Sequence, residues 1–211
     1  MDTNASSIES FISSETFISI DAETSGPNPS QYSLLTIGAC TISERPSTFY
    51  IELKPVSMNA VPAALAVSRL SMERLVERGH EPAEAMAQFE AWIKAETPEG
   101  HRPVFVAFNA PFDWMFINDY FHRFLGRNPF GHAALDIKSF YMGLAGVPWE
   151  ETSMSAIGSL YLGDRQLTHH ALRDAMDQAD LFRKLVSEAL KRSRQRSPGS
   201  RANSSNHETE P

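Results

Sequence analysis

The sequence has 211 residues and a single cysteine, Cys40, which excludes intrachain disulfides and cysteine-based metal sites. Cys40 lies in the apolar run LLTIGACTI, where we expect a small buried hydrophobic side chain rather than a reactive thiol. Long apolar runs are also lacking. The longest, such as Pro103 to Phe108, are far shorter than the ~20 residues that a helix needs to cross a bilayer. The sequence therefore predicts no membrane span.

Basic residues are scarce at the N-terminus, where none precedes the first apolar residue and no continuous apolar core follows. This pattern matches neither a secretory signal nor a transit peptide, so we expect a cytoplasmic protein. The whole chain has a net charge of -7, but the segment from Lys191 to the end carries five basic and two acidic residues. The acidic charge therefore belongs to the body of the protein, which argues against electrostatic coating of nucleic acid.

Composition predicts one globular domain with tails, because 42% of the residues are hydrophobic and 21% are charged. The C-terminal segment SRQRSPGSRANSSNHETEP has too few apolar residues to join a core. We expect a flexible N-terminus over residues 1–13, one domain over residues 14–192, and a disordered basic and polar tail over residues 193–211.

Hydrophobic periodicity predicts strands and helices in a definite order along the chain. A helical pattern over residues 61–96 fits a two-helix crossover, and Pro111 is expected to open a helix that runs to about Phe124. Thr168 is expected to cap a final helix that continues through Lys191. The expected strands cover residues 17–22, 34–43 and 47–54 as an antiparallel start, then residues 103–108, and residues 133–137 as a fifth strand.

Asp21 and Glu23 form the first motif with chemical meaning, at the end of the first expected strand. The strand period of two puts both carboxylates on one face, beside a turn, where they can share a metal ion. Acidic residues with this spacing are common by chance, and most of them are solvated. The pair is therefore informative only together with other residues.

Asn109 and Asp113 follow the apolar strand 103–108, at the end where ligands collect in open α/β sheets. Both also have structural interpretations. Asp113 can be an acid in the first turn of a helix, favoured by the helix dipole, and Asn109 can be a helix cap. Asp136, in the segment LDIKS, is expected to cap a helix at least as readily as it would act directly.

The segment HHALRD combines His169 with Asp174 at the start of the last expected helix. A metal ligand needs rigidity and a general base needs reach, so Asp174 inside the helix and His169 at its entry suit these two roles. The alternative is that two histidines and an aspartate merely decorate a helix start.

In this order, IDAETSG, FNAPFD and HHALRD resemble the three motifs of the DEDDh, or DnaQ-like, 3′-to-5′ exonucleases of the ribonuclease H-like superfamily. The resemblance implies a ribonuclease H-like α/β fold: a central five-stranded mixed sheet, its first three strands antiparallel and the others parallel, flanked by helices. It assigns metal ligation to Asp21, Glu23, Asp113 and Asp174, and the general base to His169. His170 stands where a second branch of the superfamily has tyrosine. RNPFGHAALDIKSF is similar to a stretch of ribonuclease T.

The chemistry of these residues agrees with the resemblance. Carboxylates without cysteine make a hard oxygen site that suits two Mg²⁺ or Mn²⁺ ions, which would neutralise charge on the scissile phosphate. The resemblance implies hydrolysis from the 3′ end of single-stranded or 3′-overhanging DNA or RNA, with release of nucleoside 5′-monophosphates. It is also consistent with a homodimer. Candidate substrate-binding residues are Thr24, Ser25, Gly26, Asn109 and Phe112.

Two other classes of function stay open on the sequence. One is a catalytically silent exonuclease-like domain that binds nucleic acid or a protein, although the presence of all five site residues argues against it. The other is a ribonuclease H-like endonuclease or a different two-metal phosphoesterase, which would use similar acids without His169 in that register.

Overall fold

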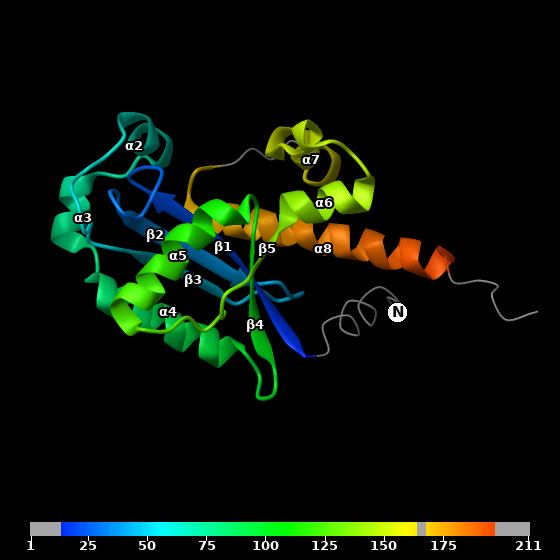
Figure 1. The fold of residues 1–211 in the computed structure, drawn as a ribbon, viewed down its shortest axis with the longest axis horizontal. Helices are drawn as coiled ribbons and strands as arrows, with labels where there is room; N and C mark the ends of the chain where they lie inside the picture. The colour runs from blue at the N-terminus through cyan, green and yellow to red at the C-terminus, as the bar shows by residue number, and fades with distance from the viewer. Residues whose placement is uncertain (1–13, 164–167, 197–211) are drawn as a thin grey trace, which may run out of the picture.

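The computed structural model describes residues 14–163 and 168–196 of the chain. Its centre is a five-stranded sheet in the order β3-β2-β1-β4-β5 (Figure 1). The pairs β1/β2 and β2/β3 are antiparallel, whereas β1/β4 and β4/β5 are parallel. The expected α/β fold with a mixed sheet is therefore confirmed. The strands are β1 (Glu15–Thr24), β2 (Leu34–Thr41), β3 (Thr48–Glu52), β4 (Arg102–Ala107) and β5 (Ala134–Asp136).

Helices cover both faces of the sheet, and the alternation of β1 divides the core between them. Ile18 and Ile20 pack with the apolar residues of α4 and α5. Phe17 points to the other face, where it joins the apolar residues of α6, α7 and α8. Asp21 and Glu23 share the parity of Phe17 and so face α8. The helices are α2 (Pro62–Ser68), α3 (Met72–Arg78), α4 (Pro82–Glu96), α5 (Ala110–Leu125), α6 (Ile137–Ala145), the 3-10 helix η1 (Trp149–Thr152), α7 (Met154–Tyr161) and α8 (Ala171–Arg196).

The segment between β3 and β4 forms three helices, so the expected two-helix crossover is wrong. Arg69 adopts a left-handed conformation with φ of 58° and ends α2. The Ser71 hydroxyl then caps α3 by accepting a hydrogen bond from the Arg74 N–H. Gly79 ends α3, and Pro82 occupies the first turn of α4. A continuous helical periodicity conceals these local breaks, because the apolar stripe resumes after each of them.

The last helix, α8, begins at Ala171 and runs to Arg196, so the expected cap at Thr168 is wrong. The Thr168 N–H and hydroxyl instead donate hydrogen bonds to Oδ1 of Asp174, at 2.9 and 3.1 Å. The expected flexible N-terminus and residues 197–211 of the expected tail lie outside the described residues. Throughout the described part of the chain, every helix is too short or too polar to span a bilayer.

Gly38 in β2 lies opposite Asp21 of β1 and faces the start of α8. A Cβ atom at position 38 would lie 2.1 Å from the backbone carbon of Ala171 and 2.1 Å from the backbone nitrogen of Leu172. Because neither neighbour is a flexible side chain, only glycine allows the two backbones to approach this closely. Gly38 therefore sets the position of α8 over the sheet.

We predict that Gly38→Ala destabilises the protein by about 1–3 kcal/mol, the usual range for overpacking a core, because it displaces the start of α8. Gly143→Ala is the matched control, because Gly143 is an exposed residue of α6 with no atom within 4 Å of an added Cβ. This control should gain up to ~1 kcal/mol from better helix propensity. Urea unfolding measures both changes, and equal free energies for Gly38→Ala and wild type would contradict the packing argument.

Candidate functional site

Three carboxylates converge where β1 ends and α8 begins. Asp21, Glu23 and Asp174 each offer one oxygen, and these oxygens lie within 4.8 Å of one another. Asp21 and Glu23 are half-buried, and Asp174 is only 3% exposed. The strand period presents the first two residues to α8, and Gly38 lets the first turn of α8 bring Asp174 beside them. The arrangement has the spacing and donor type of a cation site.

Asp113 lies next to this group but not within it. It occupies the first turn of α5 and is 5% exposed. Its Oδ1 accepts a hydrogen bond of 2.9 Å from the N–H of Ala22, which lies between Asp21 and Glu23 in β1. Its negative charge raises the pKa of Asp21. The structure therefore brings three of the four predicted ligands together and holds the fourth against the same strand.

The electrostatics of the cluster are unfavourable in the protein alone. Burial raises the pKa of Asp21 well above its usual range, and the charges of Asp113, Glu23 and Asp174 raise it further. Burial and the charge of Asp174 raise the pKa of Glu23 to about 7. Burial is also the main cause that raises the pKa of Asp113. Among the described residues, no basic side chain is found to lower the pKa of these three carboxyls, and a divalent cation would supply the opposite charge.

His169 and His170 precede α8 and are both exposed, but their environments differ. The ring of His170 stacks on the ring of Tyr50 in β3, with centroids 4.9 Å apart and an interplanar angle of 25°. The His170 carbonyl accepts a hydrogen bond from the N–H of Asp174. His169 adopts a left-handed backbone conformation with φ of 52°, which is uncommon for a residue other than glycine. His170 is thus packed, and the neighbouring His169 lies in a strained turn.

Hydrogen bonds connect the turn after β1 to neighbouring parts of the chain. Thr24 and Ser25 are buried, and the Thr24 hydroxyl donates to the carbonyl of Gly26. The Ser25 N–H donates to Ser33, and its carbonyl accepts from Val61. A nucleotide contact through the backbone of Ser25 would therefore have to share bonds that the fold already uses. These hydrogen bonds restrain the turn, which directly follows Glu23 in the chain.

Asn109 and Phe112 lie at the start of α5. Asn109 occupies the N-cap position of α5, as its structural interpretation predicted, but it has a left-handed φ of 62° and its side chain makes no capping hydrogen bond. The Ala110 N–H instead donates to Oδ1 of Asp136, whose other carboxylate oxygen caps α6. Phe112 is half-buried, and its ring packs on Phe116 with centroids 5.7 Å apart. The side chain of Asn109 is exposed to solvent. The predicted capping role of Asp136 is confirmed.

Two residues that shape the site, Gly38 and Gln178, were not predicted from the sequence. Gly38 makes the close contact with the backbone of α8. A glycine inside an otherwise apolar strand could have indicated such a close backbone approach. Gln178 follows Asp174 by one helical turn, and its Nε2 donates a hydrogen bond of 2.7 Å to Oδ1 of Asp21. A polar residue on the apolar stripe of α8, one turn after a predicted ligand, could have indicated this contact.

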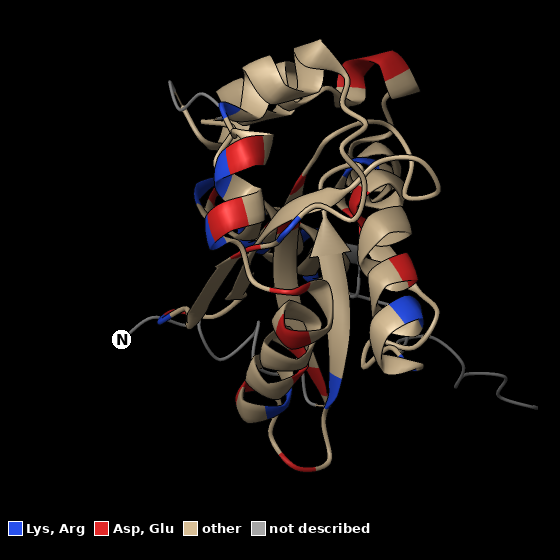
Figure 2. Cartoon of the chain, turned by 90° about the vertical axis from the view of Figure 1, so that its left-hand side faces the viewer, with Lys and Arg blue, Asp and Glu red and all other residues tan. Residues whose placement is uncertain are grey.

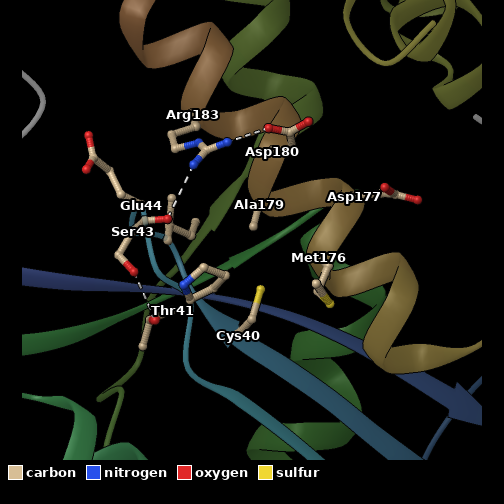
Figure 3. A pocket seen from close by; sticks show the side chains of 11 residues that line it. Cys40, Thr41, Ser43, Glu44, Met176, Asp177, Ala179, Asp180 and Arg183 are labelled. Atoms are coloured by element: carbon tan, nitrogen blue, oxygen red, sulfur yellow. Dashed lines mark hydrogen bonds and ion pairs between the residues drawn. The ribbon is translucent and has the colours of Figure 1, made fainter. Parts of the chain in front are cut away.

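A pocket of about 330 Å³ lies elsewhere along α8, against the end of β2 (Figure 3). Arg183 closes one side by pairing with Asp180 and donating to the Ser43 carbonyl. Cys40 lines the pocket and is fully buried, as expected, and burial raises the pKa of its thiol to about 12. The lining contains none of the predicted site residues, so the carboxylate cluster and this pocket are separate features.

Positive and negative residues are interspersed on the helices rather than separated into one basic stripe (Figure 2).

The sheet order and its helical layers are those of the ribonuclease H-like fold, and the carboxylates lie where β1 ends. A family model described as an exonuclease family, RNase_T, matches residues 18–182, which include all five predicted catalytic residues. The chain belongs to this exonuclease family, in its DEDDh branch of 3′-to-5′ exonucleases.

Relatives of known activity and known structure support this assignment. A 3′-5′ DNA exonuclease of Escherichia coli, Cap18, is 50% identical over 169 residues, covering 80% of this chain and 90% of the relative. The nuclease domain of 3'hExo, a DEDDh family member bound to rAMP, has a TM-score of 0.70 at 14% identity, covering 84% of this chain and 94% of that domain. E. coli exonuclease I in complex with a dT13 oligonucleotide has a TM-score of 0.64 at 14% identity. This chain, of which 86% is covered, spans only 43% of exonuclease I.

The raised carboxyl pKa values predict that the metal-free protein loses stability as the pH rises. A carboxyl whose folded-state pKa is raised keeps its proton in the folded state at pH values where the unfolded chain has lost it. For Glu23, this interval runs from its ordinary 4.5 to about 7. The melting temperature in chelator should therefore fall between pH 4.5 and 7.

The same melting curves for Glu23→Gln give the control, because this variant removes the titrating group and should show a shallower fall. Added Mn²⁺ should restore stability most strongly at the alkaline end. A melting temperature of the metal-free protein that rises with pH over this interval would contradict the electrostatic analysis.

Proposed function

We propose that this exonuclease is metal-dependent and acts on single-stranded or 3′-overhanging DNA. The observation that carries the proposal is the convergence of Asp21, Glu23 and Asp174 within 4.8 Å, beside buried Asp113, in a chain of the exonuclease family. The preference for DNA is supported by the 50% identical relative that is a DNA exonuclease. The fold itself does not distinguish DNA from RNA, because neighbours of similar fold were solved with rAMP and with a dT13 oligonucleotide.

The donor set fits Mg²⁺ or Mn²⁺. Every candidate ligand is a carboxylate oxygen, which is the donor that these hard cations prefer. We propose that Asp21, Glu23, Asp113 and Asp174 hold two ions. When bound, such ions supply positive charge that stabilises the phosphate transition state and the leaving 3′-oxygen and makes an attacking water more acidic.

We propose His169 as the general base that takes a proton from the attacking water on an imidazole nitrogen. Imidazole titrates closer to neutrality than any other ordinary side chain, which suits proton transfer near pH 7. The stacking of His170 on Tyr50 supports this choice, because it occupies the ring of the neighbouring histidine. Tyr50 is itself restrained, since its hydroxyl donates to Glu52, which also pairs with Arg74.

We assign binding of the terminal nucleotide to residues on two sides of the carboxylate cluster. The turn of Thr24, Ser25 and Gly26 would form one wall, and Asn109 with Phe112 would contribute from the start of α5. Asn109 is exposed and offers an amide for hydrogen bonding. Only part of the Phe112 ring is accessible, because it packs on Phe116, so its contribution to base stacking is limited to one edge or face.

The test is product analysis on 5′-labelled single-stranded DNA and on RNA of the same sequence. We expect a ladder that shortens from the 3′ end, requires Mg²⁺ or Mn²⁺, stops with chelator, and proceeds faster on DNA. Asp174→Asn should abolish turnover because it removes one ligand charge with little change in volume. Asp177→Asn, on the same helix but outside the carboxylate group, is the matched control and should retain activity.

Circular single-stranded DNA separates the competing activities, because an exonuclease needs an end. Cleavage of the circle would favour a ribonuclease H-like endonuclease. Binding without turnover would favour a silent nucleic-acid-binding domain. Faster hydrolysis of RNA than of DNA would reject the proposed preference, and persistent activity in excess chelator would reject the metal site.

The two adjacent histidines give a sharper prediction. His169→Ala should lower the rate by about 10²–10⁴-fold, the usual scale for loss of a general base, while Mn²⁺ binding persists. His170→Ala should cost much less, because its packing on Tyr50 positions the turn without transferring a proton. A larger loss in His170→Ala than in His169→Ala would mean that the assignment is wrong by one residue.

A further inference from the structure

β1 and β4 separate just before the carboxylate cluster. Their last paired residues are Ser19 and Val106, and beyond this point the backbone donors between the strands need other partners. The Phe108 N–H, two residues past the last pair, donates to Oε1 of Gln178 at 2.9 Å. Gln178 is 2% exposed and lies in α8, one helical turn after Asp174. Its side chain thus fills the point at which the two strands diverge.

The orientation of the Gln178 amide follows from these contacts. A backbone N–H needs an acceptor, so Oε1 must face Phe108 and the NH₂ group must face the opposite way. There, Nε2 donates to Oδ1 of Asp21 at 2.7 Å. The amide is therefore fixed on both sides, with α8, the end of β4 and the end of β1 joined through one buried side chain.

We propose that Gln178 is a positioning residue that holds the Asp21 carboxylate in the orientation that binds metal. This inference rests on the ligand role proposed for Asp21. An ionised carboxylate has about four lone-pair sites, so one hydrogen bond from Gln178 leaves acceptor capacity for a cation. A neutral donor is suited to this task, because a lysine or arginine would bring a competing positive charge. An apolar side chain would leave Asp21 free to rotate.

The test is calorimetric titration of the metal-depleted full-length protein with Mn²⁺, alongside thermal melting. Gln178→Met keeps the approximate length of the side chain but removes both hydrogen bonds. We expect it to weaken Mn²⁺ binding by about 10–100-fold, the usual effect of losing a residue that orients a metal ligand. Gln88→Met is the matched control, since Gln88 donates to Glu84 on the exposed face of α4 and its replacement should leave Mn²⁺ affinity unchanged.

A double-mutant cycle with Asp21→Asn distinguishes positioning from general support of the fold. If Gln178 acts through Asp21, Gln178→Met should cause little further loss of Mn²⁺ affinity in the Asp21→Asn background. Equal losses in both backgrounds, or an affinity of Gln178→Met within twofold of wild type, would overturn the inference. If Gln178→Met does not fold, Gln178→Asn is used, because its shorter amide can keep only one of the two bonds. The same outcomes then apply.

The cycle also separates this inference from the proposed function. Unchanged Mn²⁺ affinity in Asp21→Asn alone would reject the ligand role of Asp21 and with it the proposed metal site. Weaker binding in Asp21→Asn together with normal binding in Gln178→Met would reject only the positioning role.

Discussion

The backbone of α8 meets the backbone of β2 at Gly38, directly opposite Asp21 on the neighbouring strand, with no side chain between them. The rest of the site depends on this contact. It sets how far Asp174 stands from Asp21 and Glu23, and it fixes the turn that carries the two histidines. It also brings Gln178 within reach of the gap between β1 and β4. The lack of a side chain at Gly38 thus sets the distance between α8 and the sheet for every residue that α8 contributes to the site.

The carboxylate cluster opposes folding, and the rest of the molecule has to compensate for it. Apolar layers on both faces of the sheet provide that stability, with four phenylalanines and a tyrosine fully buried on the α4 and α5 side. This cost arises where β1 ends and α5 and α8 begin, because buried like charges are held close together there. A rigid scaffold that tolerates local repulsion is what a preformed cation site requires, because the ligands then need little rearrangement when a cation arrives.

Local periodicity predicted the strands along the chain and placed Asp21 and Glu23 on one face of β1. The grouping of these two residues with Asp113 and Asp174 came from the resemblance of three motifs to a known family, because periodicity does not relate residues on different elements. The third crossover helix was missed, since a left-handed residue such as Arg69 breaks a helix without breaking the apolar stripe. The partners of Thr168 and Gln178 were missed because they lie on other turns or other strands, and no local pattern records such contacts.

Asp136 binds the first turns of two helices at once, since its two carboxylate oxygens accept from Ala110 at the start of α5 and from Ser139 in α6. This shared carboxylate makes α5 and α6 mechanically linked at their N-terminal ends. The last residue of the edge strand β5 is thereby bonded to the first turn of the helix that carries Asp113.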